Sequence, residues 1–401
     1  MRVVIAPDKF AGTLSATEAA SAISVGWRSA APGDELILAP MSDGGPGFLD
    51  TVAAVFDGLT TATVEDPIGR NVPASWLQTD VAGTRIAVIE SAQACGLMRL
   101  SRDEFDPGRA SSYGVGQLIS VALSSGAHRI LVGLGGTAAN DGGAGMAQAL
   151  GVRLLDADGK ELPRGGLALE RLASIDRSGL DPRLDGVDVI AVADVDNPLV
   201  GENGASAVFG RQKGADEETS RRLDAALAHY ASVVGIADLA AAPASGAAGG
   251  LGFGLLAFAG ATVQPGLALV AGILGLRGKI ADADVVVTGE GRFDDQSLRG
   301  KVPAGVAEFA LAAGVPCVVL AGDVTVDEVS MQAAGIAKAY ALTPLAGGTA
   351  QALAQPAYWL EKLAAQAARE WSSKEEPTEG AAQEVAEMSA DGPATAEGMR
   401  S

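Results

Sequence analysis

The chain has 401 residues, of which 48% are hydrophobic and 4% aromatic, and its formal net charge is −20. A chain of this size can bury one large or two medium hydrophobic cores. Its acidity repels nucleic-acid phosphates and anionic membrane surfaces, so we expect neither of them as a partner.

The cysteine content and the apolar stretches indicate a cytoplasmic protein. Cys95 and Cys317 lie far apart and form neither a disulfide framework nor a metal-ligand spacing, which favours reducing cytoplasm. The apolar run after Met1 is too short for a signal peptide. The long apolar stretch 249–276 is interrupted by several glycines and by Pro265, so we expect no membrane span.

Short apolar runs alternate with helical patterns at the start of the chain. These patterns predict, in order, a buried strand at 2–6, a helix at 15–30, a strand at 36–39 and a helix at 48–56. Ser15 followed by Glu18 has the spacing of a capping box, which supports the start of the first helix.

The middle of the chain has a different pattern. Between 61 and 90, apolar positions separated by Gly and Pro turns predict short antiparallel strands, and we expect a second domain to begin here. Further on, the patterns predict helices at 113–124, 143–150 and 219–234, strands at 128–134 and 185–193, and a glycine-rich run at 246–254 ahead of an apolar helix.

The last third returns to alternating strands and helices. Strands are predicted at 283–287, 316–321 and 336–342, and helices at 302–313 and 349–370. Residues 372–401 are rich in Glu, Ala, Pro, Ser and Thr, a composition typical of a disordered acidic tail.

This order of elements predicts an α/β fold with two domains. We expect a Rossmann-like, doubly wound parallel sheet from residues 1–60 and 275–371. A second α/β domain, residues 61–274, would be inserted into it and would carry a Gly-rich loop. Ligands would bind in the cleft between the two domains.

Five polar or glycine-rich segments follow predicted strands, where open α/β sheets bind their ligands. They are 6–14 (APDKFAGTL), 42–47 (SDGGPG), 133–143 (GLGGTAANDGG), 193–199 (ADVDNPL) with the later 209–215 (FGRQKGA), and 288–301 (TGEGRFDDQSLRGK). Together they predict a site for an anionic, hydroxylated ligand and a nucleotide.

The segment 133–143 is the most specific of the five. It lies between a predicted strand and a predicted helix, where consecutive backbone N–H groups form an anion site. It matches neither the Walker A motif nor the dinucleotide-binding fingerprint. The alternative is a glycine-rich tight loop without a ligand.

Each of the other segments also has a purely structural alternative. Asp8 and Asp43 are common turn residues, and Asp196-Asn197-Pro198 is a typical turn initiator. The segment 288–301 could be an exposed charged turn. The functional alternatives are substrate or phosphate contacts for Asp8 and Lys9, and a hydroxyl or metal contact for Asp43.

Taken in order, these segments resemble the glycerate kinase family, of the bacterial glycerate 2-kinase type. The matching stretches are Ala6-Pro7-Asp8 with Gly12-Thr13-Leu14, Asp43-Gly44-Gly45, Gly135-Gly136 with Asn140-Asp141-Gly142-Gly143, Asp194-Val195 with Asn197-Pro198-Leu199, Gln212-Lys213-Gly214-Ala215, 247–252 (AAGGLG), and Thr288-Gly289-Glu290-Gly291 with Asp294 and Gln296. The resemblance extends from Met1 to about Arg369.

The resemblance implies phosphoryl transfer from ATP to D-glycerate with Mg²⁺, with 2-phosphoglycerate favoured over 3-phosphoglycerate as product. Its partners would be these small molecules, and a homodimer is a candidate assembly. The chain departs from the family pattern at Ala11, where Lys is frequent, at Pro46 and Phe48 within the common Asp-Gly-Gly-Glu-Gly-Thr, and at Thr137, where Ser is frequent. The first two changes bear on substrate preference and rate.

The motifs supply the candidate site residues. The catalytic candidates are Asp194, the first choice as proton acceptor, then Asp8, Asp294 and Lys9, and Asp294 and Asp194 are the candidate metal ligands. The substrate-binding candidates are Asp43, Asn197, Gln212, Lys213 and Arg292. The nucleotide and phosphate candidates are Gly135, Gly136, Thr137, Asn140, Asp141, Glu290 and Lys301. Neither His128 nor His229 belongs to a motif, and we expect both to be structural.

Three alternatives to a glycerate kinase stay open at this point. One is a kinase of another small hydroxy acid. Another is a catalytically silent ligand sensor, suggested by Ala11 and Pro46. The third is a nucleotide-dependent oxidoreductase, against which the missing dinucleotide fingerprint argues.

Overall fold

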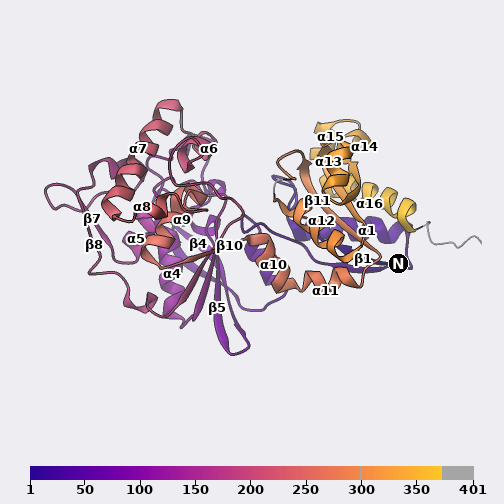
Figure 1. The fold of residues 1–401 in the computed structure, drawn as a ribbon, viewed down its shortest axis with the longest axis horizontal. Helices are drawn as coiled ribbons and strands as arrows, with labels where there is room; N and C mark the ends of the chain where they lie inside the picture. Colours follow the sequence, from indigo (N-terminus) through magenta and orange to yellow (C-terminus); the bar gives the residue numbers. More distant parts are fainter. Residues whose placement is uncertain (299, 373–401) are drawn as a thin grey trace, which may run out of the picture.

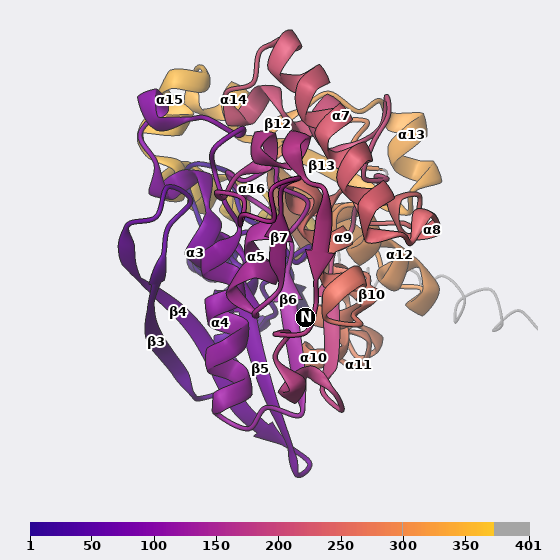
Figure 2. The same ribbon diagram turned by 90° about the vertical axis from the view of Figure 1, so that its left-hand side faces the viewer.

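The computed structural model describes residues 1–298 and 300–372, and shows an α/β protein with two large sheets (Figures 1 and 2). The expectation of α/β domains with parallel sheets is confirmed. The predicted acidic tail lies outside the described residues except for Ser372, the last residue of a helix. The proposed domain limits stay a prediction.

The first sheet is entirely parallel and has five strands. They are β1 (Arg2–Ile5), β2 (Glu35–Leu38), β11 (Val285–Phe293), β12 (Cys317–Val324) and β13 (Ile336–Ala341). The spatial order is β13-β12-β11-β1-β2, so the order is that of flavodoxin-like sheets, with a long insertion between the second and third strands.

Both faces of the five-stranded sheet are covered, as a buried parallel sheet requires. Val3 and Ile5 lie in one hydrophobic cluster with α1 (Ala16–Ala30) and α16 (Pro356–Ser372), whereas Val4 lies in another with α12 (Val302–Ala313). Alternate strand residues point to opposite faces, which explains this division. The predicted capping box of α1 is present.

The second sheet has six strands and is mixed. They are β3 (Leu59–Glu65), β4 (Asn71–Val81), β5 (Thr84–Glu90), β6 (Arg129–Gly133), β9 (Asp188–Val192) and β10 (Thr262–Gln264), in the order β10-β9-β6-β5-β4-β3. The antiparallel strands predicted between 61 and 90 are confirmed, and β5, β6, β9 and β10 are parallel. A separate antiparallel pair consists of β7 (Arg153–Leu155) and β8 (Ser174–Asp176).

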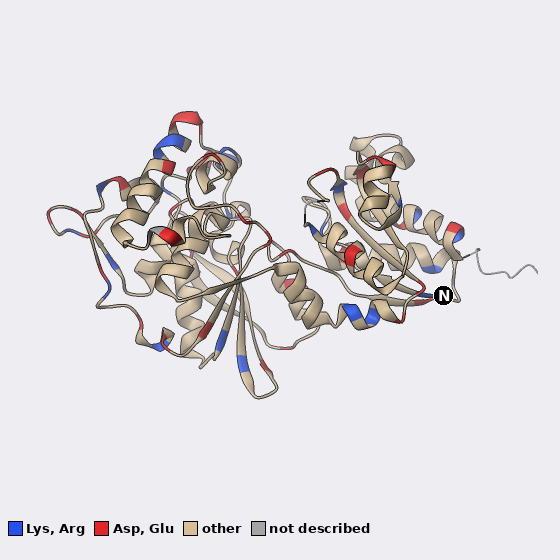
Figure 3. Ribbon diagram, viewed as in Figure 1, with Lys and Arg blue, Asp and Glu red and all other residues tan. Residues whose placement is uncertain are grey.

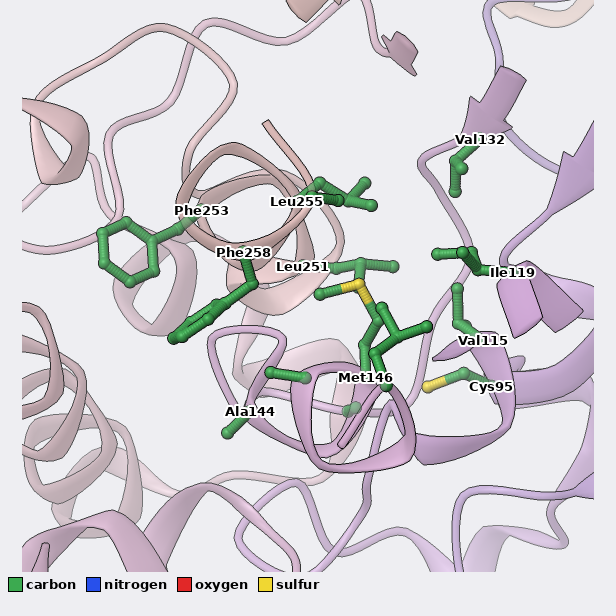
Figure 4. Packing of buried hydrophobic residues seen from close by; sticks show 14 of the residues in the cluster. Cys95, Val115, Ile119, Val132, Ala144, Met146, Leu251, Phe253, Leu255 and Phe258 are labelled. Atoms are coloured by element: carbon green, nitrogen blue, oxygen red, sulfur yellow. The ribbon is translucent and has the colours of Figure 1, made fainter. Parts of the chain in front are cut away.

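One face of the six-stranded sheet packs on its own set of helices. These are α3 (Ala92–Cys95), α4 (Tyr113–Ser124), α5 (Ala144–Ala149), α6 (Ala205–Phe209), α7 (Glu217–Val234), α8 (Ala237–Ala240) and α9 (Ala247–Phe258). Figure 4 shows Met146 of α5 next to Leu251 of α9, with Val115 and Ile119 of α4 on the strand side. Among the described residues, the members of this core all lie outside the five-stranded sheet.

A second core joins the two sheets. Helices α2 (Phe48–Ala53), α10 (Gly266–Leu274) and α11 (Leu276–Ala281) lie where the chain passes from one sheet to the other (Figure 1). Val88 and Leu131 of the six-stranded sheet belong to the same cluster as Val4 and Val286 of the five-stranded sheet. The two sheets therefore share buried apolar side chains.

Two predicted elements differ from the structure. The motif 288–291 is not a loop, because β11 continues through it to Phe293 and pairs with β12. The single helix predicted at 349–370 is two helices, α15 (Thr349–Ala354) and α16. Pro356 explains the break, since the residue before a proline is kept out of the helical region, and Gln355 has φ −140°.

The remaining elements are short. Helices α13 (Glu328–Ala333) and α14 (Leu342–Ala346) follow β12 and β13, and 3-10 turns occur at Leu97–Arg99, Arg102–Glu104, Gly166–Arg171, Pro182–Leu184 and Arg211–Lys213. Lys and Arg residues are spread over both sheets and their helices (Figure 3). Within residues 1–298 and 300–372, no helix is long and apolar enough to cross a membrane.

Candidate functional site

The main candidate site lies where the order of the five-stranded sheet reverses, between β1 and β11. Ligands of open α/β sheets bind at such a point, outside the carboxyl ends of the strands. A cavity of about 620 Å³ is found there. Six of the predicted site residues line it: Asp8, Lys9, Asp43, Glu290, Arg292 and Lys301.

Lys9 lies between two carboxylates in this cavity. Its Nζ is 3.2 Å from Asp43 Oδ1 and 3.5 Å from Asp8 Oδ1, and its backbone N–H donates to Asp8 Oδ1 at 2.8 Å. Burial raises the pKa of Asp8 to about 6, against the lowering effect of Lys9. Burial also opposes the charge on Lys9, yet Asp43 and Asp8 hold its pKa above the ordinary value. Lys9 is therefore a fixed cation.

Asp194 brings a third carboxylate toward this pair from the end of β9 in the six-stranded sheet. Its Oδ2 accepts a hydrogen bond from Leu267 N at 3.0 Å, at the start of α10. Burial, with a smaller contribution from the charges of Asp43 and Asp8, raises the pKa of Asp194 to about 6, against the lowering effect of the backbone hydrogen bond from Leu267. The two sheets thus contribute carboxylates that interact with one another.

Glu290, within β11, is a buried carboxyl on the cavity wall. It is 6% exposed, and its Oε1 has no hydrogen-bond partner among the described residues. Burial raises its pKa to about 7, with Lys301 lowering it and Asp8 and Asp294 raising it. Asp294 lies nearby, with its Oδ2 3.7 Å from Arg292 Nε.

The Gly-rich loop after β6 forms a second, smaller cavity. Gly135, Gly136 and Thr137 line about 110 Å³ together with Gln212 and Lys213. Lys213 is 3% exposed, and its Nζ donates to Ala139 O at 2.6 Å and to Thr137 Oγ1 at 3.4 Å. Burial lowers the pKa of Lys213 to about 8. This lysine has no carboxylate ion pair within the described residues, so an anionic ligand would stabilise its charge.

The two cavities are joined by direct contact between their loops. A Cβ on Gly135 would lie 2.7 Å from Gly45 Cα, and one on Gly136 would lie 2.5 Å from Pro46 Cγ. Gly136 also has φ +65°, which favours glycine. The loop that carries Asp43 therefore rests on the Gly-rich loop, and the family departure at Pro46 falls on this contact.

Two predicted phosphate-binding residues lie inside the fold. The buried Asn140 donates from Nδ2 to Ser206 Oγ at 2.8 Å. Asp141 is also buried, and its carboxylate accepts hydrogen bonds from Ser112 N, Ser112 Oγ, Gly143 N and Gly145 N. These hydrogen bonds hold the turn that leads into α5, so the buried Asp141 stabilises the conformation of the Gly-rich loop.

Asn197, a predicted substrate residue, donates from Nδ2 to the backbone carbonyl of Asn203 at 2.8 Å. Gln212 is exposed at the mouth of the smaller cavity. His128 accepts from Arg85 N at 3.3 Å and His229 contacts Leu172 O at 2.7 Å, so both histidines have structural partners.

Glu90 was not predicted as a site residue. It ends β5 and is 4% exposed, and its Oε2 accepts hydrogen bonds from Gly47 N at 3.0 Å and Leu49 N at 3.1 Å. Burial raises its pKa. It thereby ties the loop after Asp43 to the six-stranded sheet. The sequence feature that could have identified Glu90 is a carboxylate as the last residue of an otherwise apolar strand.

The carboxylates do not form a closed metal cage. Among residues 1–298 and 300–372, no group of three or more His, Cys, Asp or Glu is arranged to hold a metal ion. Mg²⁺ usually keeps several waters and binds through one or two carboxylates together with substrate phosphates. The donor chemistry of Asp8, Asp43 and Asp194 fits that kind of open site.

An α/β fold with a cavity of this size and charged residues at the ends of its parallel strands is typical of an enzyme that acts on small molecules. The family model of the glycerate kinase family matches residues 3–372. The chain therefore belongs to the glycerate kinase family, whose members are phosphotransferases that act on an alcohol group.

Individual relatives agree with this assignment. A glycerate kinase of Halalkalibacterium halodurans is 43% identical over 90% of this chain and 96% of its own length. A glycerate 2-kinase of Escherichia coli K12 is 46% identical over 82% of this chain and 86% of its own length. A crystal structure assigned as glycerate kinase 2, from Salmonella typhimurium LT2, has 40% identity and a TM-score of 0.76, covering 93% of this chain and 98% of that one.

Proposed function

We propose that this chain transfers the γ-phosphoryl group of ATP to a hydroxyl of D-glycerate, with 2-phosphoglycerate as product. The observation that carries the proposal is Lys9 held between Asp8 and Asp43 at the switch point of the sheet. It supplies a fixed cation for anionic ligands in a member of the glycerate kinase family. The relative from Escherichia coli named glycerate 2-kinase supports the choice of product.

The residues act mainly by positioning and by charge, as in phosphoryl transfer generally. The carboxylate of Asp194 accepts the proton of the attacking hydroxyl, with Asp8 and Asp294 as the alternatives. Lys9, Arg292 and Lys301 balance the negative charge of the transferring group. A cation at this position is worth several kcal/mol of transition-state stabilisation, on the order of 10²–10³ in rate.

The Gly-rich loop would hold an anionic group from the other side. Backbone N–H groups of Gly135, Gly136 and Thr137 bind phosphate oxygens, and the charge on Lys213 favours the same anion. Asp43, on the wall of the larger site cavity, contacts a glycerate hydroxyl. Asn197 and Gln212 lie outside that lining and would contact the substrate hydroxyls on closure of the cleft around glycerate.

Asp294 would hold Mg²⁺ through water, and Asp194 is the alternative ligand if Asp8 accepts the proton. The ion would neutralise part of the phosphate charge during transfer. The enzyme would act on these small molecules in the cytoplasm. The molar mass measured by light scattering would distinguish a monomer from the proposed homodimer.

The test follows ADP release with D-glycerate, ATP and Mg²⁺ and separates the phosphoglycerate isomers by ³¹P NMR. We expect 2-phosphoglycerate, and we expect Asp194→Asn to abolish turnover. Asp185→Asn, an exposed aspartate before the other end of β9, is the matched control and should keep full activity. ATP binding without turnover of D-glycerate would contradict the proposal, and other hydroxy acids would then be assayed. Formation of 3-phosphoglycerate would overturn the regiochemistry alone.

A further inference from the structure

The 620 Å³ cavity changes character from one end to the other. Its lining runs from the end of β1 through β11 and β12 to α14, which follows β13, and then to α15 and α16. The end beside β1 and β11 is charged, with the cations Lys9, Arg292 and Lys301 next to the carboxyl groups of Asp8, Asp43 and Glu290. The end beside β13 and α15 is apolar and is lined by Leu342, Ala352, Leu353 and Pro356.

The apolar end exposes a large hydrophobic side chain. Leu353 is 58% exposed although it lies on a cavity wall. Apolar surface in a concave site typically meets an apolar part of a ligand, and a planar base would remove this surface from water. The cavity volume lies within the range of small-molecule sites.

Polar groups stand between the two ends. Thr343 Oγ1 donates to Gly322 O at 2.9 Å, which fixes the start of α14 against β12, and Asp323 follows Gly322 on the cavity wall. The buried Glu290 presents an Oε1 that has no hydrogen-bond partner within the described residues. Carboxylate oxygens in such positions are acceptors for ligand hydroxyl groups.

We infer that this cavity is the nucleoside triphosphate site, with the base between Leu342 and Leu353, the ribose hydroxyls near Asp323, and the phosphates at Lys9 and Lys301. The inference rests on the proposed kinase function and adds the location of the nucleotide. The transferring phosphate would then point toward Asp43 and the Gly-rich loop that Asp43's segment contacts. Glycerate would be bound on the side of the six-stranded sheet.

The larger neighbouring cavity of about 730 Å³ fits a triphosphate less well. Of its described lining residues, Asp194, Asp196 and Glu308 are acidic and Arg277 is basic. The guanidinium of Arg277 lies over the Phe309 ring at 4.1 Å from its centroid. Among the described lining residues of this cavity, the sole cation is therefore already engaged by a ring, whereas three cations line the 620 Å³ cavity.

The experiment compares two exposed leucines on neighbouring helices. Leu353→Asp places a charge on the cavity wall, whereas Leu345→Asp makes the same change on α14 at a side chain that is 38% exposed and outside the lining set. We expect Leu353→Asp to weaken ATP binding at least tenfold by calorimetry and to raise KM for ATP similarly, with KM for glycerate unchanged. Leu345→Asp should leave both constants within twofold of the unsubstituted protein.

The outcomes separate this inference from the proposed function. Turnover of glycerate with an unchanged ATP affinity in Leu353→Asp would overturn the location and leave the function standing. Absence of glycerate turnover, combined with ATP binding that Leu353→Asp abolishes, would support the location and contradict the function. Asp323→Ala adds a second readout, because it should reduce the preference for ATP over its 3′-deoxy analogue several-fold, and an unchanged preference would contradict the ribose assignment.

Discussion

At the scale of single residues, the site brings together carboxyl groups that lie wholly or partly out of water and disfavour one another's ionisation. Asp8, Asp194 and Glu290 have their pKa values raised to about 6, 6 and 7, in each case chiefly by burial. Lys9 offsets part of this charge in a chain whose formal net charge is −20. Perturbed groups that cluster in a cleft are typical of active sites.

Replacing Lys9 should lower the rate more than it lowers stability. In Lys9→Met the transition state loses its cation, so we expect kcat to fall on the order of 10²–10³-fold. Steady-state kinetics with saturating ATP and glycerate measure the change. Lys160→Met removes an exposed lysine far from the cavity and should leave kcat unaltered. Equal rates for both variants would exclude Lys9 from the chemistry.

The ionised carboxylate of Asp194 should lower the free energy of unfolding, although the same group supports activity. Its folded pKa, about 6, lies above the ordinary value of 3.8, so between these pH values the folded state holds a proton that the unfolded state has released, and stability falls as pH rises. The upshift corresponds to at most about 3 kcal/mol, which partial solvent exposure reduces to about 1–2 kcal/mol.

Asp194→Asn should therefore melt at a higher temperature than the parent at pH 7.5 and at a similar temperature at pH 4, while being inactive. Its amide oxygen still accepts the hydrogen bond from Leu267 N. Thermal unfolding followed by circular dichroism at both pH values checks the sign. A variant that is less stable at pH 7.5 than at pH 4, relative to the parent, would contradict the burial argument.

At the scale of elements, the contact between two loops decides whether the two halves of the site meet. Glu90 fixes the start of α2 through the N–H groups of Gly47 and Leu49. The preceding Gly45 lies against Gly135 at a separation that leaves no space for a Cβ. Small displacements at such a contact would move Asp43 relative to the Gly-rich loop.

Gly135→Ala tests this contact. The added methyl group would lie 2.7 Å from Gly45 Cα, a backbone atom that must shift, so we expect kcat/KM to fall at least tenfold with the protein still folded. The control is Gly272→Ala on α10, where no atom lies within 4 Å of the new Cβ and where alanine should stabilise the helix by about 0.5–1 kcal/mol. Unchanged kinetics in Gly135→Ala would show that the contact does not position the site.

At the scale of the whole molecule, a shared hydrophobic cluster holds the two sheets together. Side chains of α2 and α10 pack between them, so the carboxyl ends of β1 and β9 are placed relative to each other by buried apolar surface. Asp8 and Asp194 follow those two ends, and the charge of Asp8 raises the pKa of Asp194. The proposed catalytic carboxylates therefore come from both sheets.

The family match and the lining of both site cavities lie within residues 1–372. Deletion of residues 373–401 should accordingly leave kcat and both KM values unchanged within about twofold. Steady-state assays of the truncated and full chains measure this. A change in KM of fivefold or more would assign the acidic segment a part in substrate binding.

The sequence by itself determined the local elements and the residue types of the site. Alternation of β-branched runs with helical periodicity identified both sheets, and the capping box at Ser15 and Glu18 formed as predicted. Motifs after predicted strands named Asp8, Lys9 and Asp43, because such positions converge at one edge of a parallel sheet. The same reasoning named Glu290, which lines the cavity from within β11. These inferences depend only on neighbours in the chain.

Tertiary structure alone decided which of those residues meet. Asn140 and Asp141 belong to the strongest motif, yet they are buried and hold the loop, because hydrogen-bond partners such as Ser206 and Ser112 come from distant segments. The hydrogen bond from Leu49 N to Glu90 likewise depends on β5 and α2 lying side by side in the fold, so no local pattern predicts the role of Glu90. The apolar end of the cavity likewise combines α14, α15 and α16. Burial and charge at such places are set by packing between elements that are distant in the sequence.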